Sequence, residues 1–242
     1  MKTVEILGVR INNVTMAEAV ETVKGLLEKN APSAVYTPNS EIIYRAKNDE
    51  EFKNVLNSSD LNVADGIGVV YGAKILGTPI PERVAGYDLA CNLLPVMNEK
   101  KAKLFLFGGK EGVGQRAKEN ILKKYPDINI VGIKNGYFTD SAPIIEAINE
   151  TEPDFVFVCL GAPKQEKWIH ENKEKLKCRV MMGIGGSLDV FAGEAERAPD
   201  IFIKMNLEWF YRLMKNPSRI GRMMDLPKFG IAVALSRVTK KS

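Results

Sequence analysis

The sequence has few of the residues on which many catalytic and metal sites depend. Its 242 residues include one histidine, His170, and three cysteines, Cys91, Cys159 and Cys178. The cysteines are odd in number and widely spaced among apolar neighbours, which argues against a disulfide framework and a cysteine zinc site. A single histidine in a charged stretch argues against a histidine-based triad or a histidine-rich metal site. We therefore expect a reducing, cytoplasmic compartment.

Long apolar runs and common nucleotide-binding signatures are also missing. No run of about 18 apolar residues occurs, so no transmembrane helix is expected. Glu5 and Arg10 interrupt the apolar stretch at the N-terminus, which is unlike a signal peptide. The missing GxGxxG disfavours a nicotinamide-dependent oxidoreductase, and the missing GxxxxGK(S/T) disfavours a P-loop enzyme. DxD, a common means of holding Mg²⁺ on a nucleotide sugar, is absent too, so we expect metal-independent chemistry without a cofactor.

Charge is unevenly distributed along the chain. The chain carries 34 Lys+Arg against 30 Asp+Glu, a formal net charge of +4. Residues 196–242 alone contain ten Lys/Arg and four Asp/Glu, so the preceding residues have a net charge of −2. A basic tail of this kind indicates an anionic partner. A nucleic acid, an anionic membrane and a diphosphate all satisfy that description.

Short apolar runs alternate with amphipathic stretches through residues 1–195. Strands are expected at residues 4–9, 34–37, 61–64, 103–107, 128–133, 155–160 and 179–184. Helices are expected at residues 16–29 (with Thr15 as N-cap), 39–47, 49–57, 67–76, 87–100, 113–125, 142–150 and 164–174. Continuous apolar strands between helices are typical of a parallel sheet covered on both faces. The predicted fold is α/β, a Rossmann-like and mostly parallel sheet.

The pattern changes near residue 195, where we place a domain boundary. One helix is expected over residues 199–215 and a second from Pro217. If these helices were collinear, four cations would share one face: Arg212, Lys215, Arg219 and Arg222. Aromatic residues and the apolar stretch 229–235 accompany them, which is typical of a membrane interface. A packed subdomain or an oligomer contact is the alternative for this helical C-terminal appendage, residues 196–242.

Polar or glycine-rich segments follow five of the expected strands. They are Thr37-Pro38-Asn39, Ala64-Asp65-Gly66, Gly108-Gly109-Lys110, residues 160–166 and Gly183-Ile184-Gly185-Gly186-Ser187. Ligands of parallel α/β sheets bind beyond the carboxyl ends of the strands. The sequence therefore predicts a binding site at this rim.

Three of these rim residues suit sugar chemistry. A carboxylate at the position of Asp65 could take a proton from an attacking hydroxyl, although Asp65 could also be the N-cap of the following helix. Thr37 and Asn39 present a hydroxyl and an amide, which orient sugar hydroxyls in concave sites. Turn chemistry around Pro38 explains Thr37 and Asn39 equally well.

Other rim residues suit a nucleotide. Gly108 and Gly109 precede an expected helix whose N–H groups could hold phosphate, and a tight turn is the alternative. Gln165 could contact a uracil or ribose edge. Arg83 lies in a proline-containing loop and could bind phosphate in a bidentate way, whereas a surface Arg–Glu pair is its alternative. By their place at the rim we also expect Gly185 and Gly186 to contact the nucleotide.

Together these motifs resemble the WecG/TagA/CpsF glycosyltransferases (glycosyltransferase family 26). The resemblance covers nearly the whole chain in family order. The matching stretches are residues 37–41, 64–69, 81–86, 107–109, 136–138, 161–166, 183–187, 197–199 and 207–212.

The resemblance implies an inverting transfer of N-acetylmannosamine from its UDP donor to the GlcNAc 4-hydroxyl of a polyprenyl diphosphate, a step of wall teichoic acid synthesis. It places Asp65 at the base. It also places Thr37, Asn39, Arg83 and Gln165 at substrate-binding positions. The tail arginines fall in the region that meets the lipid diphosphate: Arg212, Arg219 and Arg222. We hypothesise that the tail folds over the rim at the membrane and brings an arginine to the phosphates.

Other readings stay open at this point. The family also includes N-acetylmannosaminuronic acid and glucosyl transferases, and a non-catalytic nucleotide-binding membrane scaffold would keep the same glycines and basic tail. We expect a peripheral protein on the inner face of the cell membrane, with no nucleic-acid partner. A homo-oligomer would be one way to cover the apolar face of residues 201–213.

Overall fold

The computed structural model describes residues 1–29, 31–217 and 220–239. Its centre is a six-stranded sheet in the order β4-β3-β8-β7-β5-β6, in which every pairing is parallel. The strands are β3 (Ser33–Tyr36), β4 (Leu61–Asn62), β5 (Lys103–Gly108), β6 (Asn129–Lys134), β7 (Phe155–Cys159) and β8 (Val180–Gly183). The predicted parallel α/β sheet is confirmed.

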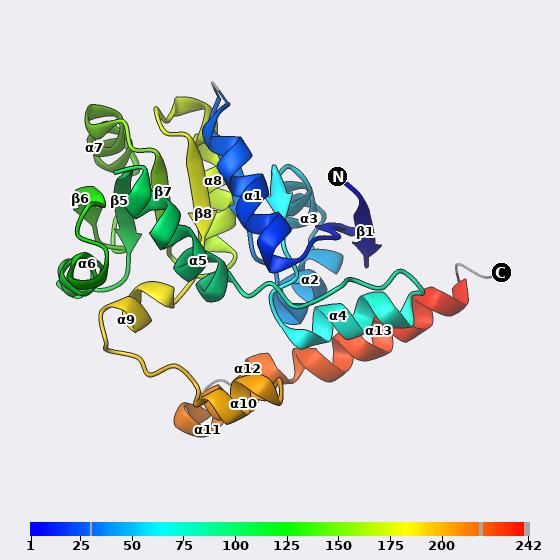
Figure 1. Ribbon diagram of the computed structural model, residues 1–242. Coiled ribbons are helices and arrows are strands. Elements are labelled where there is room, and N and C mark those ends of the chain that lie inside the picture. Colours follow the sequence, from blue (N-terminus) through cyan, green and yellow to red (C-terminus); the bar gives the residue numbers. More distant parts are fainter. Residues whose placement is uncertain (30, 218–219, 240–242) are drawn as a thin grey trace.

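Helices cover both faces of this sheet (Figure 1). The first face carries α1 (Met16–Leu27), α5 (Gly86–Glu99), α6 (Val113–Lys124) and α9 (Ser187–Phe191). The second carries α2 (Ser40–Lys47), α3 (Glu50–Asn57), α4 (Ile67–Ile75), α7 (Ala142–Thr151) and α8 (Lys164–Asn172), which a 3₁₀ turn (Lys173–Lys175) follows.

The central strand β7 shows why its sequence is apolar throughout. All five residues of β7 are buried. Phe155 and Phe157 belong to the core on the first face, whereas Val156 and Val158 belong to the core on the second. Successive strand side chains point to opposite faces, so a sheet covered twice needs an apolar residue at every position.

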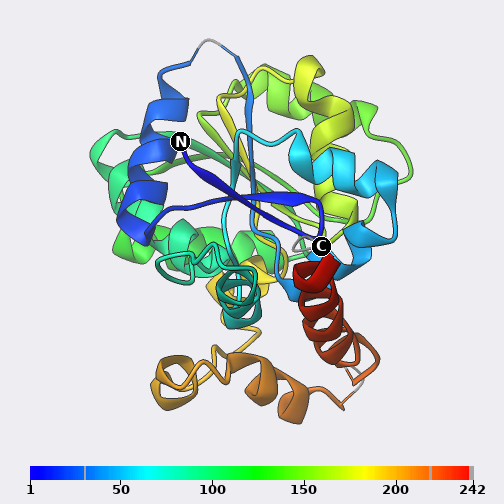
Figure 2. The same cartoon turned by 90° about the vertical axis from the view of Figure 1, so that its right-hand side faces the viewer.

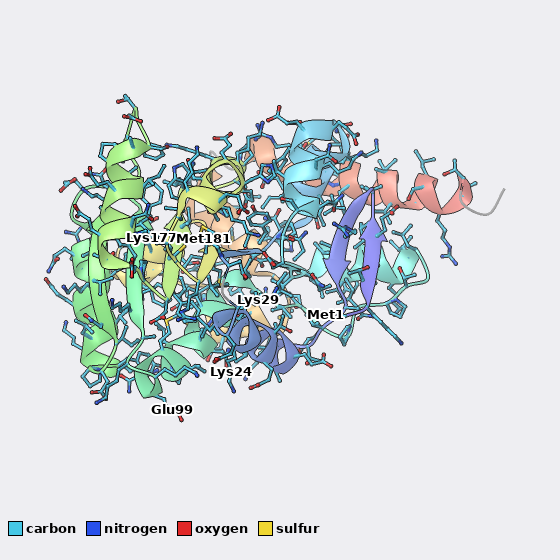
Figure 3. All side chains as sticks on the ribbon, turned by 90° about the horizontal axis from the view of Figure 1, so that it is seen from above. Met1, Lys24, Lys29, Glu99, Lys177 and Met181 are labelled. Carbon is cyan, nitrogen blue, oxygen red and sulfur yellow. The ribbon has the colours of Figure 1, made fainter. Side chains whose placement is uncertain are left out.

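The N-terminus differs from the expected single strand over residues 4–9. It forms an antiparallel hairpin of β1 (Thr3–Ile6) and β2 (Val9–Asn12), which packs against α4 (Figure 3). The turn residues Leu7 and Gly8 both have positive φ, at 50° and 85°. Two such residues are what a tight two-residue hairpin turn requires, and Gly8 was the local signal for it.

The expected helix over residues 199–215 is interrupted. It consists of α10 (Asp200–Lys204) and α11 (Glu208–Lys215). Between them Asn206 has φ of 60°. A left-handed residue ends a helix, and asparagine tolerates that conformation better than most side chains.

The last helix returns to the body. After α12 (Ile220–Met223), helix α13 (Asp225–Thr239) packs on α4 and α2, whereas α10 to α12 lie below the body (Figures 1 and 2). Phe229 and Val233 are buried there. The apolar stretch 229–235, which the sequence suggested for a membrane, therefore has one face packed on the protein, while Ile231 and Leu235 on it stay exposed.

The sequence also predicted a domain boundary and the lack of a transmembrane helix. The domain boundary near residue 195 stays a prediction. Within the part of the chain that the structure describes, no helix has both the length and the apolar character needed to cross a membrane.

Candidate active site

The five predicted rim segments lie along one edge of the sheet. The six strands of the central sheet are all parallel, so the residues that follow them emerge at the same edge, in the spatial order of the strands. Asp65 after β4 and Gly108 at the end of β5 are four strand spacings apart, roughly 19 Å. Thr37, Gly185 and residues 160–166 lie between them.

Asp65 is tied into the rim through backbone and side chain. Its N–H donates to the Pro38 carbonyl at 3.2 Å, which joins the turns after β3 and β4. Its Oδ2 accepts from the Gly86 N–H at 3.3 Å, at the start of α5. The N-cap of the following helix, α4, is Gly66, without a side-chain cap. The N-cap interpretation of Asp65 is therefore wrong, and its carboxylate sits at the rim instead.

Thr37 and Asn39 adjoin Asp65 in different ways. Thr37 is buried, and its hydroxyl donates to the Gly183 carbonyl at 3.1 Å, which links β3 to β8. Asn39 is the N-cap of α2, because its Oδ1 accepts from the Ile42 N–H at 3.0 Å. Both side chains thus make a hydrogen bond within the protein, and their contact with a sugar stays a prediction.

Gln165 is buried beneath the rim, 3% exposed. Its Oε1 accepts from the Gly185 N–H at 2.9 Å, and its Nε2 donates to Glu166 Oε1 at 2.8 Å. Burial raises the pKa of the Glu166 carboxyl group above its usual value, against the opposing effect of the Gln165 hydrogen bond. Gln165 therefore holds the glycine turn after β8 in place, and its predicted contact with the nucleotide stays untested.

Replacing Gln165 with leucine should weaken this turn. The Gly185 N–H and the buried Glu166 would each lose a partner, so we expect the free energy of unfolding to fall by about 1–3 kcal/mol, measured by urea denaturation. Gln115→Leu is the matched control, since Gln115 is exposed and its side chain bonds to its helical neighbour Glu119. Its change should stay within about 0.5 kcal/mol. Equal losses in the two variants would contradict a positioning role for Gln165.

A cavity of about 820 Å³ lies at the other end of the rim, beyond β5, β6 and β7. Two lysines border it: Lys110, and Lys164, which donates to the Gly136 carbonyl at 3.1 Å. Tyr137, 72% exposed, and the carboxylate of Asp189 also line it. Sequence patterns give no individual role to Tyr137, which follows β6, or to Asp189, which lies in α9 after β8.

Gly109, which lines this cavity, belongs to a tight glycine turn after β5. Gly108 and Gly109 have φ of 129° and 69°, and the Gly109 N–H donates to the Cys159 carbonyl at 3.3 Å. The turn is therefore tight in its own right, which was the alternative to a phosphate-binding role. Burial raises the pKa of the Cys159 thiol, which lines the same cavity. A protonated thiol is a poor nucleophile.

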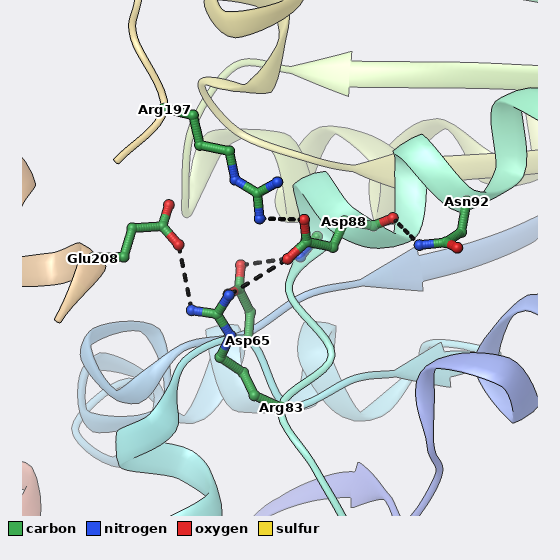
Figure 4. Close-up of polar contacts among 7 residues, drawn as sticks. Asp65, Arg83, Asp88, Asn92, Arg197 and Glu208 are labelled. Atoms are coloured by element: carbon green, nitrogen blue, oxygen red, sulfur yellow. Dashed lines mark hydrogen bonds and ion pairs between the residues drawn. The ribbon is translucent and has the colours of Figure 1, made fainter. Parts of the chain in front are cut away.

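Arg83 lies near Asp65 but not on the open surface. Its Nη1 donates to Glu208 of α11 at 3.3 Å, and its Nη2 donates to Asp88 of α5 at 3.4 Å (Figure 4). Arg83 does pair with a glutamate, as the alternative stated. The pair is not exposed, however, because both side chains are mostly buried. No sequence signal joined residues 83 and 208, which only the fold brings together.

The remaining candidates are His170 and the arginines of the tail. His170 is exposed and its Nδ1 shares a hydrogen bond with the Ser58 hydroxyl. Among residues 1–29, 31–217 and 220–239, no three His, Cys, Asp or Glu side chains are grouped as a metal site would require. Arg219 lies outside the described residues, and so do the side chains of Arg212 and Arg222 in α11 and α12, so the predicted basic face is untested.

Comparison with known proteins places this arrangement among glycosyl transferases. The profile of the "Glycosyl transferase WecG/TagA/CpsF family" matches residues 4–242. The N-acetylglucosaminyldiphosphoundecaprenol N-acetyl-beta-D-mannosaminyltransferase of Bacillus subtilis (strain 168) is 40% identical over 219 residues, 90% of this chain and 86% of the relative. The protein of the same name from Staphylococcus aureus (strain MRSA252) is 35% identical over 237 residues, 97% of this chain and 93% of the relative.

Proposed function

Since this chain belongs to the glycosyl transferase WecG/TagA/CpsF family, we propose that it transfers N-acetylmannosamine from UDP to GlcNAc-diphosphoundecaprenol. The names of the similar curated proteins support this acceptor and this sugar. They do not support a uronate or glucose donor, or a scaffold without activity. The single structural observation that carries the proposal is the rim itself, which has a nucleotide-sized cavity at one end and the Asp65 carboxylate at the other.

The cavity suits the nucleotide of the donor. An exposed aromatic ring such as Tyr137 can stack on a base, and the Asp189 carboxylate can accept hydrogen bonds from ribose hydroxyls. Lys110 and Lys164 supply positive charge for phosphate. From β7 to β4 is three strand spacings, roughly 14 Å. The diphosphate and the sugar of an extended donor would bridge that interval, past the Gly185-Gly186 turn.

Chemistry would then occur beside Asp65. The acceptor 4-hydroxyl attacks the anomeric carbon, its proton passes to Asp65, and the bond to the UDP oxygen breaks with its electron pair leaving on UDP. One displacement inverts the anomeric carbon and needs one base and no covalent nucleophile. Charge develops on the departing diphosphate, and the Arg83 guanidinium, which lies beside Asp65 (Figure 4), can stabilise it.

The acceptor is a lipid, so the appendage is the part we expect at the membrane. Its short helices leave large apolar side chains exposed: Ile201, Met205, Trp209, Phe210 and Met214. Apolar and aromatic residues next to cations favour an anionic bilayer surface. The lipid-linked acceptor named for the relatives supports this placement.

The experiment is a measurement of UDP release from UDP-N-acetylmannosamine, with and without a GlcNAc-diphospho-lipid. We expect release that depends on the acceptor and persists in excess EDTA, because the cations of the site are lysine and arginine side chains. Loss of release in EDTA, restored by Mg²⁺, would contradict metal-independent transfer. Release only from a UDP-uronate or UDP-glucose donor would contradict the proposed sugar.

A further inference from the structure

Arg83 is held by two carboxylates from distant parts of the chain. Glu208 accepts from Nη1 and Asp88 from Nη2 (Figure 4). The side chains of Arg83 and Glu208 are only 14% and 12% exposed, although the two residues are 125 positions apart. Arg83 is therefore a junction between the sheet domain and α11 of the appendage.

Asp88 is itself held firmly. Its other carboxylate oxygen, Oδ1, accepts from Arg197. The Arg197 guanidinium lies 5.1 Å from the centroid of the Tyr87 ring, and that ring packs on Phe191 at 5.0 Å. Asp88 also lies in the first turn of α5, where the helix dipole favours a negative charge. These contacts leave Asp88 little freedom, so it is a stable anchor for Arg83.

The same helix start carries the proposed base. Gly86, whose N–H donates to Asp65, precedes Asp88 by two residues. A guanidinium group is planar and rigid, so carboxylates on its two Nη nitrogens determine the direction of the whole group. It has five N–H donors, so it can hold both carboxylates and still contact a phosphate. The orientation of Arg83 relative to Asp65 thus depends on Asp88 and Glu208.

Stability alone is a weak reason for this cluster. Ion pairs that are largely withdrawn from water gain little net stability, because the desolvation of both charges offsets their attraction. Two carboxylates beside an anion site also repel a bound diphosphate in the ground state. A catalytic function explains the cluster better. If Arg83 stabilises the negative charge that develops in the transition state, its orientation matters more than its affinity for the bound substrate.

We propose that Asp88 and Glu208 are positioning residues that aim Arg83 at the departing diphosphate. Glu208 makes that aim depend on α11 being docked against the sheet domain. The inference rests on the proposed transferase function and gives neither carboxylate a contact with substrate.

Steady-state kinetics of the full-length chain with UDP-N-acetylmannosamine and the GlcNAc-diphospho-lipid test this proposal. We expect Glu208→Gln and Asp88→Asn each to lower kcat about tenfold or more, with the donor KM unchanged or lower. Both act through Arg83, so the double variant should lose less than the product of the two single losses. If Asp88→Asn does not fold, Glu208→Gln alone tests the proposal, by whether the loss appears in kcat or in the donor KM.

Glu196→Gln is the matched control. Glu196 precedes α10, pairs with Lys215 of α11 at 3.3 Å, and has a side chain that is 77% exposed. Its kcat should stay within about twofold of the wild type. Hydrogen exchange of residues 208–215 should rise more in Glu208→Gln than in Glu196→Gln, because the contacts of Glu196 with Tyr211 and Lys215 are exposed and hold α11 only weakly.

The outcomes separate this inference from the proposed function. An active wild type with unchanged kcat in Glu208→Gln overturns the inference alone, and so does a loss that appears only as a raised donor KM. A wild type that transfers no sugar from any UDP donor overturns the proposed function, and the inference with it.

Discussion

Asp65→Asn is expected to lower kcat by roughly a thousandfold, within the range that a general base contributes. Asparagine has nearly the same shape as aspartate, and its Oδ1 can still accept from the Gly86 N–H, so the fold should be retained. It cannot take the proton of the attacking hydroxyl. Acceptor-dependent UDP release at saturating substrate is the measurement, with UDP affinity determined in parallel and expected to be unchanged.

Asp127→Asn is the control for this substitution. Asp127 is exposed and precedes β6, so it lies at the opposite edge of the sheet from the rim. Its kcat should match the wild type. If Asp65→Asn kept kcat within tenfold of the wild type, Asp65 would not be the base, and the proton would have to leave through another rim group or solvent.

Gly108→Ala is expected to lower the free energy of unfolding by at least about 3 kcal/mol, or to prevent folding. A Cβ at this position would lie 2.3 Å from the Cys159 carbonyl oxygen, and φ there is 129°. The obstructing atoms are backbone of β7, which pairs on both sides with β5 and β8, so they have no room to retreat. Urea or guanidinium denaturation measures the loss.

Gly77→Ala separates conformational strain from steric overlap in this prediction. Gly77 also has positive φ, at 82°, but a Cβ there would meet no atom within 4 Å. It should cost only about 1–2 kcal/mol, the usual penalty for a left-handed residue with a side chain. Equal small losses in Gly77→Ala and Gly108→Ala would show that the β5–β7 contact does not restrict residue 108.

Local patterns predicted most elements because their signals are local. Thr15 and Glu18 form the capping box that begins α1, with the Thr15 N–H donating to Glu18 Oε2 at 2.7 Å. The apolar runs of β5 and β7 are buried on both faces. The errors were local as well. The Leu7-Gly8 turn and the break at Asn206 depend on residues with positive φ, and apolar periodicity does not indicate such residues.

The candidate site was predictable only in outline. Parallel strands bring their carboxyl ends to one edge, so a list of strand ends was enough to find Asp65, Thr37 and the rim glycines. The partners of those residues were not predictable in this way. Gln165 turned out to hold Gly185, and Arg83 to bond with Asp88 and Glu208. Such contacts depend on helix placement to within an ångström or two, which short-range patterns do not contain.

By itself, the sequence determined the parallel α/β architecture, the shared edge at which the five polar or glycine-rich segments emerge, and the family, because apolar period and motif order are properties of the chain. Only the tertiary structure decided the return of α13 to the body, the bond between Asp65 and the start of α5, and the burial of Glu208 on Arg83. These are contacts between segments far apart in the chain. Their energies come from packing and desolvation after the whole sheet has formed, and no window of the sequence contains both partners.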